Sequence, residues 1–290
     1  MNTPKTILLT GCSSGIGFCA AVHLKKQGWQ VFATVRKKDD QSRLEAHGIA
    51  TILMDLNDSA SIINAVQTLL TQTGGQLSAL CNNAGFGQPG AIEDITREVL
   101  RTQFETNVFG LQELTNQILP IMRRQGYGRI INISSILGLM TMAYRGAYCA
   151  SKYALESLSD GLRLELQGSG IFVSLIEPGP IRSEFRNRAE MAYKQHIHPE
   201  NSVHKDSYLN LIRNMERLKK DSIFTLSPEA VVKKIQHALE SKHPKIRYRV
   251  TFPAYVLALL KRFLPDTWMD GILRRIMKSE TIEASTKKSL

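Results

Sequence analysis

A length of 290 residues allows one large domain or two small ones, and 43% hydrophobic with 22% charged residues is typical of an ordinary soluble globular protein. The formal charge of +11 comes from scattered basic residues without a long Lys/Arg tract, so we expect a solvated surface and no nucleic-acid partner. The four cysteines form neither a CxxC pair nor a disulfide-like framework, which indicates a reducing compartment.

Apolar runs of strand length alternate with helix-length amphipathic segments through the first two thirds of the chain. This rhythm predicts a parallel sheet with crossover helices. Strands are expected at residues 5–10, 30–36, 50–54, 77–82, 129–134, 171–177 and 246–250. Helices are expected at residues 15–28, 39–47, 58–73, 96–124 and 146–168. No Pro/Gly/Ser-rich linker interrupts the pattern, so we treat residues 1–290 as one domain.

A glycine-rich turn follows the first predicted strand and opens the first predicted helix. In that context glycines let a pyrophosphate approach backbone N–H groups and the helix N-terminus. The spacing is GxxxGxG rather than GxGxxG, and a tight turn without a ligand is the alternative. The flanking strand and helix and the serines within the turn favour phosphate binding. The residues expected to bind it are Gly11, Ser13, Ser14, Gly15, Ile16 and Gly17.

The end of the second predicted strand carries Arg36 and Lys37 and no acidic residue. In a dinucleotide fold this position meets the adenine ribose, where a carboxylate holds the 2′-hydroxyl of NAD and a cation accommodates the 2′-phosphate of NADP. We therefore expect NADP(H), with Arg36 as the main phosphate ligand because a guanidinium binds phosphate bidentately. The alternative is a solvated basic turn.

Polar and small residues also follow the third and fourth predicted strands. Asp55 could accept a hydrogen bond from the adenine amino group, or it could cap the helix that begins near Asp58 or Ser59. A small-residue turn after the fourth strand lies where open α/β sheets bind ligands. The cofactor contacts expected from these two turns are Asp55, Leu56, Asn83, Ala84 and Gly85.

Tyr148 and Lys152 lie four residues apart in a predicted helix, and Ser135 precedes the tyrosine by thirteen residues. The three side chains supply a phenol, an ammonium and a hydroxyl for proton transfer at one carbonyl or alcohol. The ammonium is expected to lower the tyrosine pKa from its usual value near 10, and Ser135 to bond the substrate oxygen. An ordinary exposed helical pair is the alternative.

In this order and at these separations, the motifs resemble those of the short-chain dehydrogenase/reductase family from residue 5 to about 183. The resemblance implies a single Rossmann-like domain: an α/β fold with a doubly wound, seven-stranded parallel sheet and helices on both faces. It also implies a homodimer or homotetramer. The catalytic tetrad falls on Asn107, Ser135, Tyr148 and Lys152, because the thirteen-residue step selects Ser135 over Ser134.

The same resemblance implies further contacts around the reaction centre. The main chain of Asn107 is expected to hold a water linked to Lys152, whose ammonium also binds the nicotinamide ribose. One stretch is expected to contact the nicotinamide carboxamide, with a serine where the family often has threonine. Its residues are Pro178, Gly179, Ile181 and Ser183.

More narrowly, the chain resembles bacterial NADP-dependent aldehyde reductases and, more distantly, hydroxysteroid and retinol dehydrogenases. This implies hydride transfer between NADP(H) and an apolar aldehyde or ketone, with Tyr148 as general acid. The alternatives are a hydroxysteroid- or retinol-type dehydrogenase and a non-catalytic NADP-binding redox sensor, although a sensor would not need Tyr148, Lys152 and Ser135. An apolar substrate is also indicated by side chains that could equally be core: Phe86, Leu137, Leu139, Met140, Met142 and Tyr144.

Two segments depart from the alternating rhythm. Residues 184–225 are polar and are expected to form a substrate lid, and we expect no metal site at His196 and His198 because the pair lacks supporting ligands. Residues 252–280 are expected to form amphipathic helices over the substrate mouth or against a second subunit, in preference to peripheral contact with an anionic membrane. Without room for a signal peptide or a membrane span, we expect a cytoplasmic protein.

Overall fold

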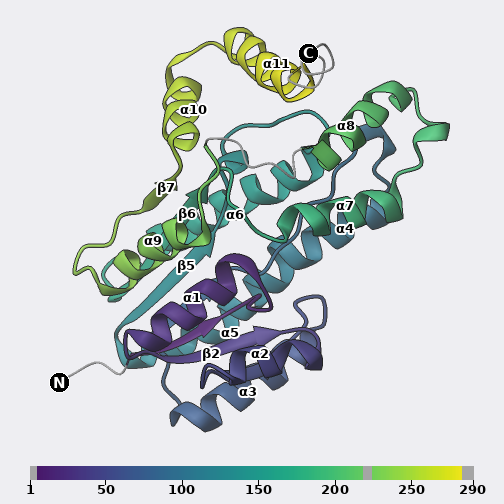
Figure 1. Cartoon of the computed structure of the whole chain (residues 1–290). Helices are drawn as coiled ribbons and strands as arrows, with labels where there is room; N and C mark the ends of the chain where they lie inside the picture. The colour runs from purple at the N-terminus through teal and green to yellow at the C-terminus, as the bar shows by residue number, and fades with distance from the viewer. Residues whose placement is uncertain (1–4, 218–223, 283–290) are drawn as a thin grey trace.

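A parallel sheet forms the centre of the molecule, and its order places the first and fourth strands side by side. The computed structural model describes residues 5–217 and 224–282, and within them the strands form one seven-stranded sheet in the order β3-β2-β1-β4-β5-β6-β7 (Figure 1). Every neighbouring pair is parallel. The strands are β1 Thr6–Leu9, β2 Gln30–Val35, β3 Ala50–Leu53, β4 Ala79–Asn82, β5 Gly128–Ile133, β6 Ile171–Pro178 and β7 Arg247–Val250. The predicted fold class is confirmed.

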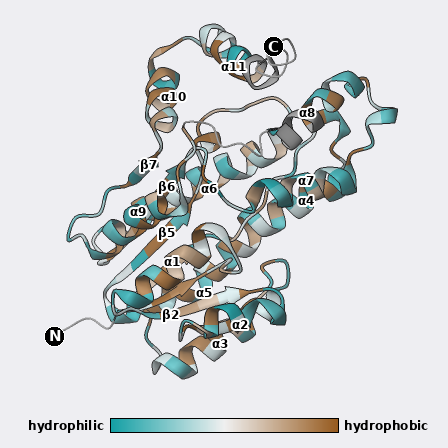
Figure 2. Cartoon of the chain, viewed as in Figure 1, coloured by the Kyte–Doolittle hydropathy of each residue, from teal (hydrophilic) through white to brown (hydrophobic). Residues whose placement is uncertain are grey.

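The strands are apolar on both faces because helices cover both sides of the sheet. In β1, Ile7 and Leu9 enter one core cluster while Leu8 enters the other, as the period-two alternation of a strand requires. Figure 2 shows the resulting concentration of hydrophobic residues along the central strands. One core lies between the sheet and α1, α2 and α9, and the other between the sheet and α3, α5 and α6. These helices are α1 Gly15–Lys26, α2 Gln41–Glu45, α3 Ser59–Thr73, α5 Gly110–Gln125, α6 Gly146–Glu165 and α9 Pro228–Glu240.

One helix, α9, was not predicted, although its start carries a readable signal. Ser227 is the N-cap, Pro228 is the first helical residue and Glu229 lies in the first turn. Proline is favourable at this position because the N–H that it lacks would have no intrahelical acceptor at the first residue of a helix. The helix packs along α1 and closes one face of the sheet.

The predicted helix over residues 96–124 is interrupted by a π turn. Helix α4 spans Arg97–Phe104, the π turn spans Glu105–Phe109, and α5 follows directly. A π turn adds one residue to the helical repeat and therefore rotates the faces of the helix before and after it. The hydrophobic period alone could not reveal it. The turn contains the buried Asn107.

The two irregular segments are helical. Residues 184–217 and 224–225 of the expected lid contain α7 Phe185–His196 and α8 Lys205–Arg217, while residues 218–223 and the chain ends of the predicted domain lie outside the described residues. Near the C-terminus, α10 Phe252–Phe263 and α11 Asp266–Ile282 lie beyond the end of the sheet in Figure 1. Among the described residues, no helix combines the length and apolar character that crossing a bilayer requires.

The start of α5 approaches the turn between β3 and α3 closely, and a glycine permits this contact. A Cβ placed on Gly110 would lie 1.8 Å from the carbonyl oxygen of Leu56, whereas a Cβ on Gly161 in α6 would meet nothing within 4 Å. We expect Gly110→Ala to lower the free energy of unfolding by about 1–3 kcal/mol through overpacking. Gly161→Ala should instead stabilise the protein by roughly 0.5–1 kcal/mol. Urea unfolding followed by circular dichroism measures both, and equal effects would contradict this account.

Candidate active site

Two turns meet where the strand order reverses between β1 and β4. The hydroxyl of Thr10 accepts hydrogen bonds from the backbone N–H of Asn83 and of Ala84, at 3.0 and 2.9 Å. In return, the Asn83 amide donates to the carbonyl oxygens of Thr10 and Gly11, at 2.8 and 3.2 Å. Ligands of open α/β sheets bind at this type of crossover point. The sequence-predicted glycine turn and Asn83 turn are thus one structure.

The glycine turn has no room for a side chain at Gly11 or Gly17, and the N-terminus of α1 that follows it has no side-chain cap. Gly11 has a φ of +71°, and a Cβ on it would lie 2.7 Å from the Cα of Ala84. A Cβ on Gly17 would lie 2.4 Å from the carbonyl oxygen of Gly11. Ser14 is the N-cap of α1 but its side chain makes no capping bond, and the first turn of α1 contains no acid. The turn therefore fits a phosphate-bearing cofactor, since N–H groups and the positive helix end face outward without a counter-charge.

Polar side chains follow β2 and β3, where the adenosine part of the cofactor is expected. Arg36 and Lys37 are exposed directly after β2. Asp55 accepts a hydrogen bond from the backbone N–H of Asn57 at 3.0 Å, whereas Asp58 caps α3 by accepting from Ala60. The cap that Asp55 could have provided is therefore made by Asp58. Leu56, which follows Asp55, is buried.

The phenol, ammonium and hydroxyl meet at the carboxyl end of β5. Ser135 lies close enough to Tyr148 to lower the pKa of the phenol, and its hydroxyl oxygen accepts the N–H of Leu137 at 3.1 Å. The buried Lys152 donates to the carbonyl oxygen of Ile133 at 2.7 Å. Ser135 is therefore the serine beside Tyr148, as the thirteen-residue spacing predicts.

Asn107 joins this centre to the β4 turn through its side chain. Its amide donates to the carbonyl oxygen of Phe86 and to the hydroxyl of Ser151, both at 3.0 Å, and accepts from the N–H of Phe86 at 3.1 Å. A Cβ on Gly85 would lie 3.0 Å from the Asn107 oxygen and 3.8 Å from Nζ of Lys152. The glycine thus leaves space beside both residues, which fits a bound nicotinamide ribose. The water expected on the main chain of Asn107 stays a prediction.

The predicted lowering of the Tyr148 pKa is wrong for the protein without cofactor. Burial raises the pKa of Tyr148 to about 12, and the hydrogen bond from Ser135 offsets only part of that effect. Lys152 cannot reverse it because Nζ is 5.9 Å from the ring centroid and bonded to Ile133. Burial also lowers the pKa of Lys152 to about 8, against the opposing charge of Glu156. The phenol is therefore protonated at neutral pH, as a proton donor must be, but burial also makes it a weaker acid.

The stretch expected at the nicotinamide carboxamide returns to the glycine turn. Gly179 donates its N–H to the carbonyl oxygen of Val250 at 3.0 Å, directly after Pro178 ends β6. Ile181 pairs with Leu226, and the Cβ of Ser183 lies 3.1 Å from a Cβ placed on Gly15. The structure thus brings this stretch beside the first turn of α1.

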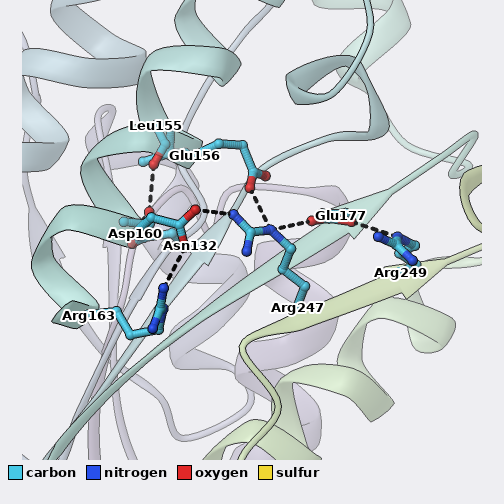
Figure 3. Close-up of polar contacts among 9 residues, drawn as sticks. Asn132, Leu155, Glu156, Asp160, Arg163, Glu177, Arg247 and Arg249 are labelled. Atoms are coloured by element: carbon cyan, nitrogen blue, oxygen red, sulfur yellow. Dashed lines mark hydrogen bonds and ion pairs between the residues drawn. The ribbon is translucent and has the colours of Figure 1, made fainter. Parts of the chain in front are cut away.

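A charge network around two buried glutamates joins α6 to β6 and β7 (Figure 3). The Arg247 guanidinium pairs with Glu156 at 3.2 Å and Glu177 at 3.1 Å, and it also bonds Asp160. The Glu177 side chain is fully buried, and Arg249 pairs with it as well. Burial raises the pKa of Glu156 to about 7. Sequence reasoning missed these residues because their pairing joins α6, β6 and β7.

Apolar residues form a wall beside Tyr148. Leu137, Met140 and Met142 are buried in a cluster with residues of α10 and α11, and Leu139 and Tyr148 pack against it. Tyr144 instead joins a cluster with residues of α7 and α8. The C-terminal helices therefore lie against the loop that carries the expected substrate-facing residues.

Helix α7 contributes two residues that sequence reasoning missed. Arg188 donates from Nη2 to the hydroxyls of Ser13 and Ser14, at 3.0 and 2.9 Å. The ring of Phe185 packs edge-on against that of Tyr148, with centroids 5.4 Å apart. No pattern distinguished Arg188 among the basic residues of this segment. At the far end of the helix, His196 bonds Gln88 rather than acting with His198.

The fold and this site define a dinucleotide-binding oxidoreductase. A family model described as short chain dehydrogenase matches residues 5–194, and the chain belongs to that family. A solved short-chain dehydrogenase from Streptomyces avermitilis superposes with a TM-score of 0.76 at 28% identity, over 99% of each chain.

Three curated relatives align over nearly the whole chain. The uncharacterized oxidoreductase YbbO of Escherichia coli K12 is 44% identical, over 93% of this chain and 94% of YbbO. Retinol dehydrogenase 8 of Bos taurus is 34% identical, over 91% of this chain and 87% of its own. The NADPH-dependent 3-dehydrocapnine reductase of Ornithobacterium rhinotracheale is 33% identical, over 96% and 99%. The chain is accordingly an enzyme acting on CH–OH or C=O groups, on small-molecule substrates, with a nicotinamide dinucleotide.

The charge network generates a stability prediction. Arg247→Ala leaves the buried carboxyl groups of Glu156 and Glu177 without their shared cation, so we expect a loss of about 3–5 kcal/mol in the free energy of unfolding. Arg101→Ala removes an exposed pair with Glu105 and should cost less than about 1 kcal/mol. Urea denaturation at pH 8 measures both variants. Similar midpoints for the two would contradict the assigned role of Arg247.

Proposed function

We propose that this protein uses NADP(H) to reduce apolar aldehydes or ketones, with Tyr148 as general acid. The observation that carries the proposal is that Tyr148, Ser135 and the buried Lys152 lie together at the carboxyl edge of the sheet: Nζ of Lys152 is 5.9 Å from the Tyr148 ring centroid, and Ser135 is close enough to lower the pKa of Tyr148. Tyr148 is protonated at neutral pH, as donation to a carbonyl oxygen requires, although burial raises the pKa of its phenol to about 12.

When bound, NADPH supplies the hydride that reduces the carbonyl carbon. Tyr148 gives its proton to the carbonyl oxygen, so hydride and proton together yield the alcohol. Ser135 donates a hydrogen bond to the same oxygen, where negative charge develops. Lys152 binds the ribose, and its ammonium stabilises the phenolate that Tyr148 becomes. Asn107 holds the β4 turn against α6 and thereby positions Lys152.

The preference for NADP rests on the charge at the end of β2. Arg36 is exposed there and, within the described residues, pairs with no carboxylate that would compete with a phosphate. The remaining cofactor contacts that we propose are those expected from the glycine turn, the β3 and β4 turns and residues 178–183. The name of the 3-dehydrocapnine reductase, which specifies NADPH, supports the same choice.

The apolar substrate rests on the wall around Tyr148. Leu137 and Met142 belong to the apolar cluster against which Tyr148 packs, and Phe185 packs edge-on against the ring of Tyr148. A retinol-type dehydrogenase is the second candidate, favoured by the 34% identity to retinol dehydrogenase 8. We place the reaction in the cytoplasm, where NADP pools are kept reduced, and expect a homodimer or homotetramer.

Replacing Tyr148 by Phe keeps the ring and removes the acid. We expect Tyr148→Phe to lower kcat for carbonyl reduction by roughly 10²–10⁴-fold while NADPH still binds. The matched control is Tyr153→Phe on the same helix, whose hydroxyl bonds Thr141 instead. NADPH oxidation with aliphatic, aromatic and retinoid aldehydes measures both. Unchanged turnover in Tyr148→Phe would rule out the mechanism.

Cofactor choice has a separate test in Arg36. Arg36→Ala should weaken NADPH binding roughly 10-fold or more, because a charge-assisted contact to the 2′-phosphate is lost. NADH has no such phosphate and serves as the internal control, with unchanged affinity. Calorimetric titration of both cofactors measures the difference. Equal losses for the two would remove the basis for NADP.

A further inference from the structure

The guanidinium of Arg188 has only weak partners in a position that favours an anion. One nitrogen, Nη2, donates to the hydroxyls of Ser13 and Ser14, and within the described residues no carboxylate is paired with the side chain. Both acceptors are neutral. A guanidinium has five N–H donors, so Nε and Nη1 remain available for a further ligand.

An anion that reached this place would make stronger bonds than the serines do. Charge-assisted hydrogen bonds between guanidinium and phosphate are about twice as strong as bonds between neutral groups and can be bidentate. Ser13 and Ser14 form the turn before α1, whose first turn carries no acid. Arg188 therefore lies directly at the turn that is expected to receive a diphosphate.

Helix α7 connects this arginine with the catalytic tyrosine. Three residues before Arg188, Phe185 packs on the ring of Tyr148, and its Cζ lies 3.0 Å from a Cβ placed on Gly87. The far end of α7 is held by the buried Tyr193 and by the bond from His196 to Gln88. The first turn of α7 is thus held by the contacts of Arg188 and Phe185. A movement of this turn would change both sets of contacts together.

We propose that Arg188 is a ligand of the cofactor diphosphate, carried by the lid helix, and that this contact holds Phe185 against Tyr148. The guanidinium exchanges the hydroxyls of Ser13 and Ser14 for phosphate oxygens when the dinucleotide binds. Cofactor occupancy then orders one wall of the substrate site. The proposal rests on the proposed nicotinamide dinucleotide but not on the preference for its 2′-phosphate.

Calorimetric titration with NADPH, NADH and 2′-AMP tests the assignment. Arg188→Ala should weaken NADPH and NADH by a similar factor, roughly 10- to 100-fold, because both carry the diphosphate. Binding of 2′-AMP, which lacks the diphosphate, should be unchanged. Arg188→Lys should recover part of the loss. This pattern differs from that of Arg36→Ala, which affects only ligands with a 2′-phosphate.

Arg186→Ala is the matched control, since it removes the same charge from an exposed position on the same helix. It should bind both dinucleotides as the wild type does. Hydrogen exchange of residues 183–196 gives an independent readout: NADPH should protect this segment in the wild type and in Arg186→Ala but not in Arg188→Ala.

Three outcomes would overturn the proposal: unchanged NADPH and NADH affinity in Arg188→Ala, an equal loss in Arg186→Ala, or an equal loss for 2′-AMP. A wild type that binds NADH as tightly as NADPH would refute the NADP preference alone. A wild type that binds neither dinucleotide would refute both proposals.

Discussion

The reciprocal hydrogen bonds between Thr10 and Asn83 are the constraint on which the rest of the site depends. They fasten the glycine turn after β1 to the turn after β4. The chain then passes to Phe86, which Asn107 clamps through both its N–H and its carbonyl oxygen, and Asn107 in turn bonds Ser151, next to the catalytic lysine. The glycine turn and α6 are therefore linked through the β4 turn by polar contacts that are buried or part-buried, and such a network is rigid when its members have their partners.

Burial determines the charges of this centre more than proximity does. Lys152 has a lowered pKa and Tyr148 a raised one, although opposite effects would follow if the ammonium and the phenol were in direct contact. The carboxyl group of Glu156 opposes the effect of burial on the lysine, and Arg247 links that carboxyl group to Glu177. Glu156 thus favours the charged form of the buried Lys152, while the pairing of Glu156 with Arg247 keeps this carboxyl group within the charge network.

The sequence could predict what local pattern and strand order determine. Every strand was expected, because short runs rich in apolar residues alternate with helix-length amphipathic segments, and the carboxyl ends of parallel strands meet at one edge. The π turn around Asn107 was not predicted, because the insertion of one residue leaves the helical period of hydrophobic residues on either side unchanged. The direction of the Tyr148 pKa shift was predicted wrongly, because the burial that raises the pKa depends on tertiary packing. Arg188 escaped because its role comes from the fold of α7 over a turn 174 residues away.

The chemistry and the choice of substrate are supplied by different parts of the molecule. The proposed proton donor and its proposed partners lie on strand ends and on α6, and in that role they would act on any carbonyl that reaches Tyr148. The walls come from Phe185 of the lid helix and from Leu137 and Met142 packed under α10 and α11. An apolar wall discriminates by only about 1–3 kcal/mol per methylene group. Selectivity must therefore accumulate over a long contact, which favours extended apolar carbonyl compounds over short ones.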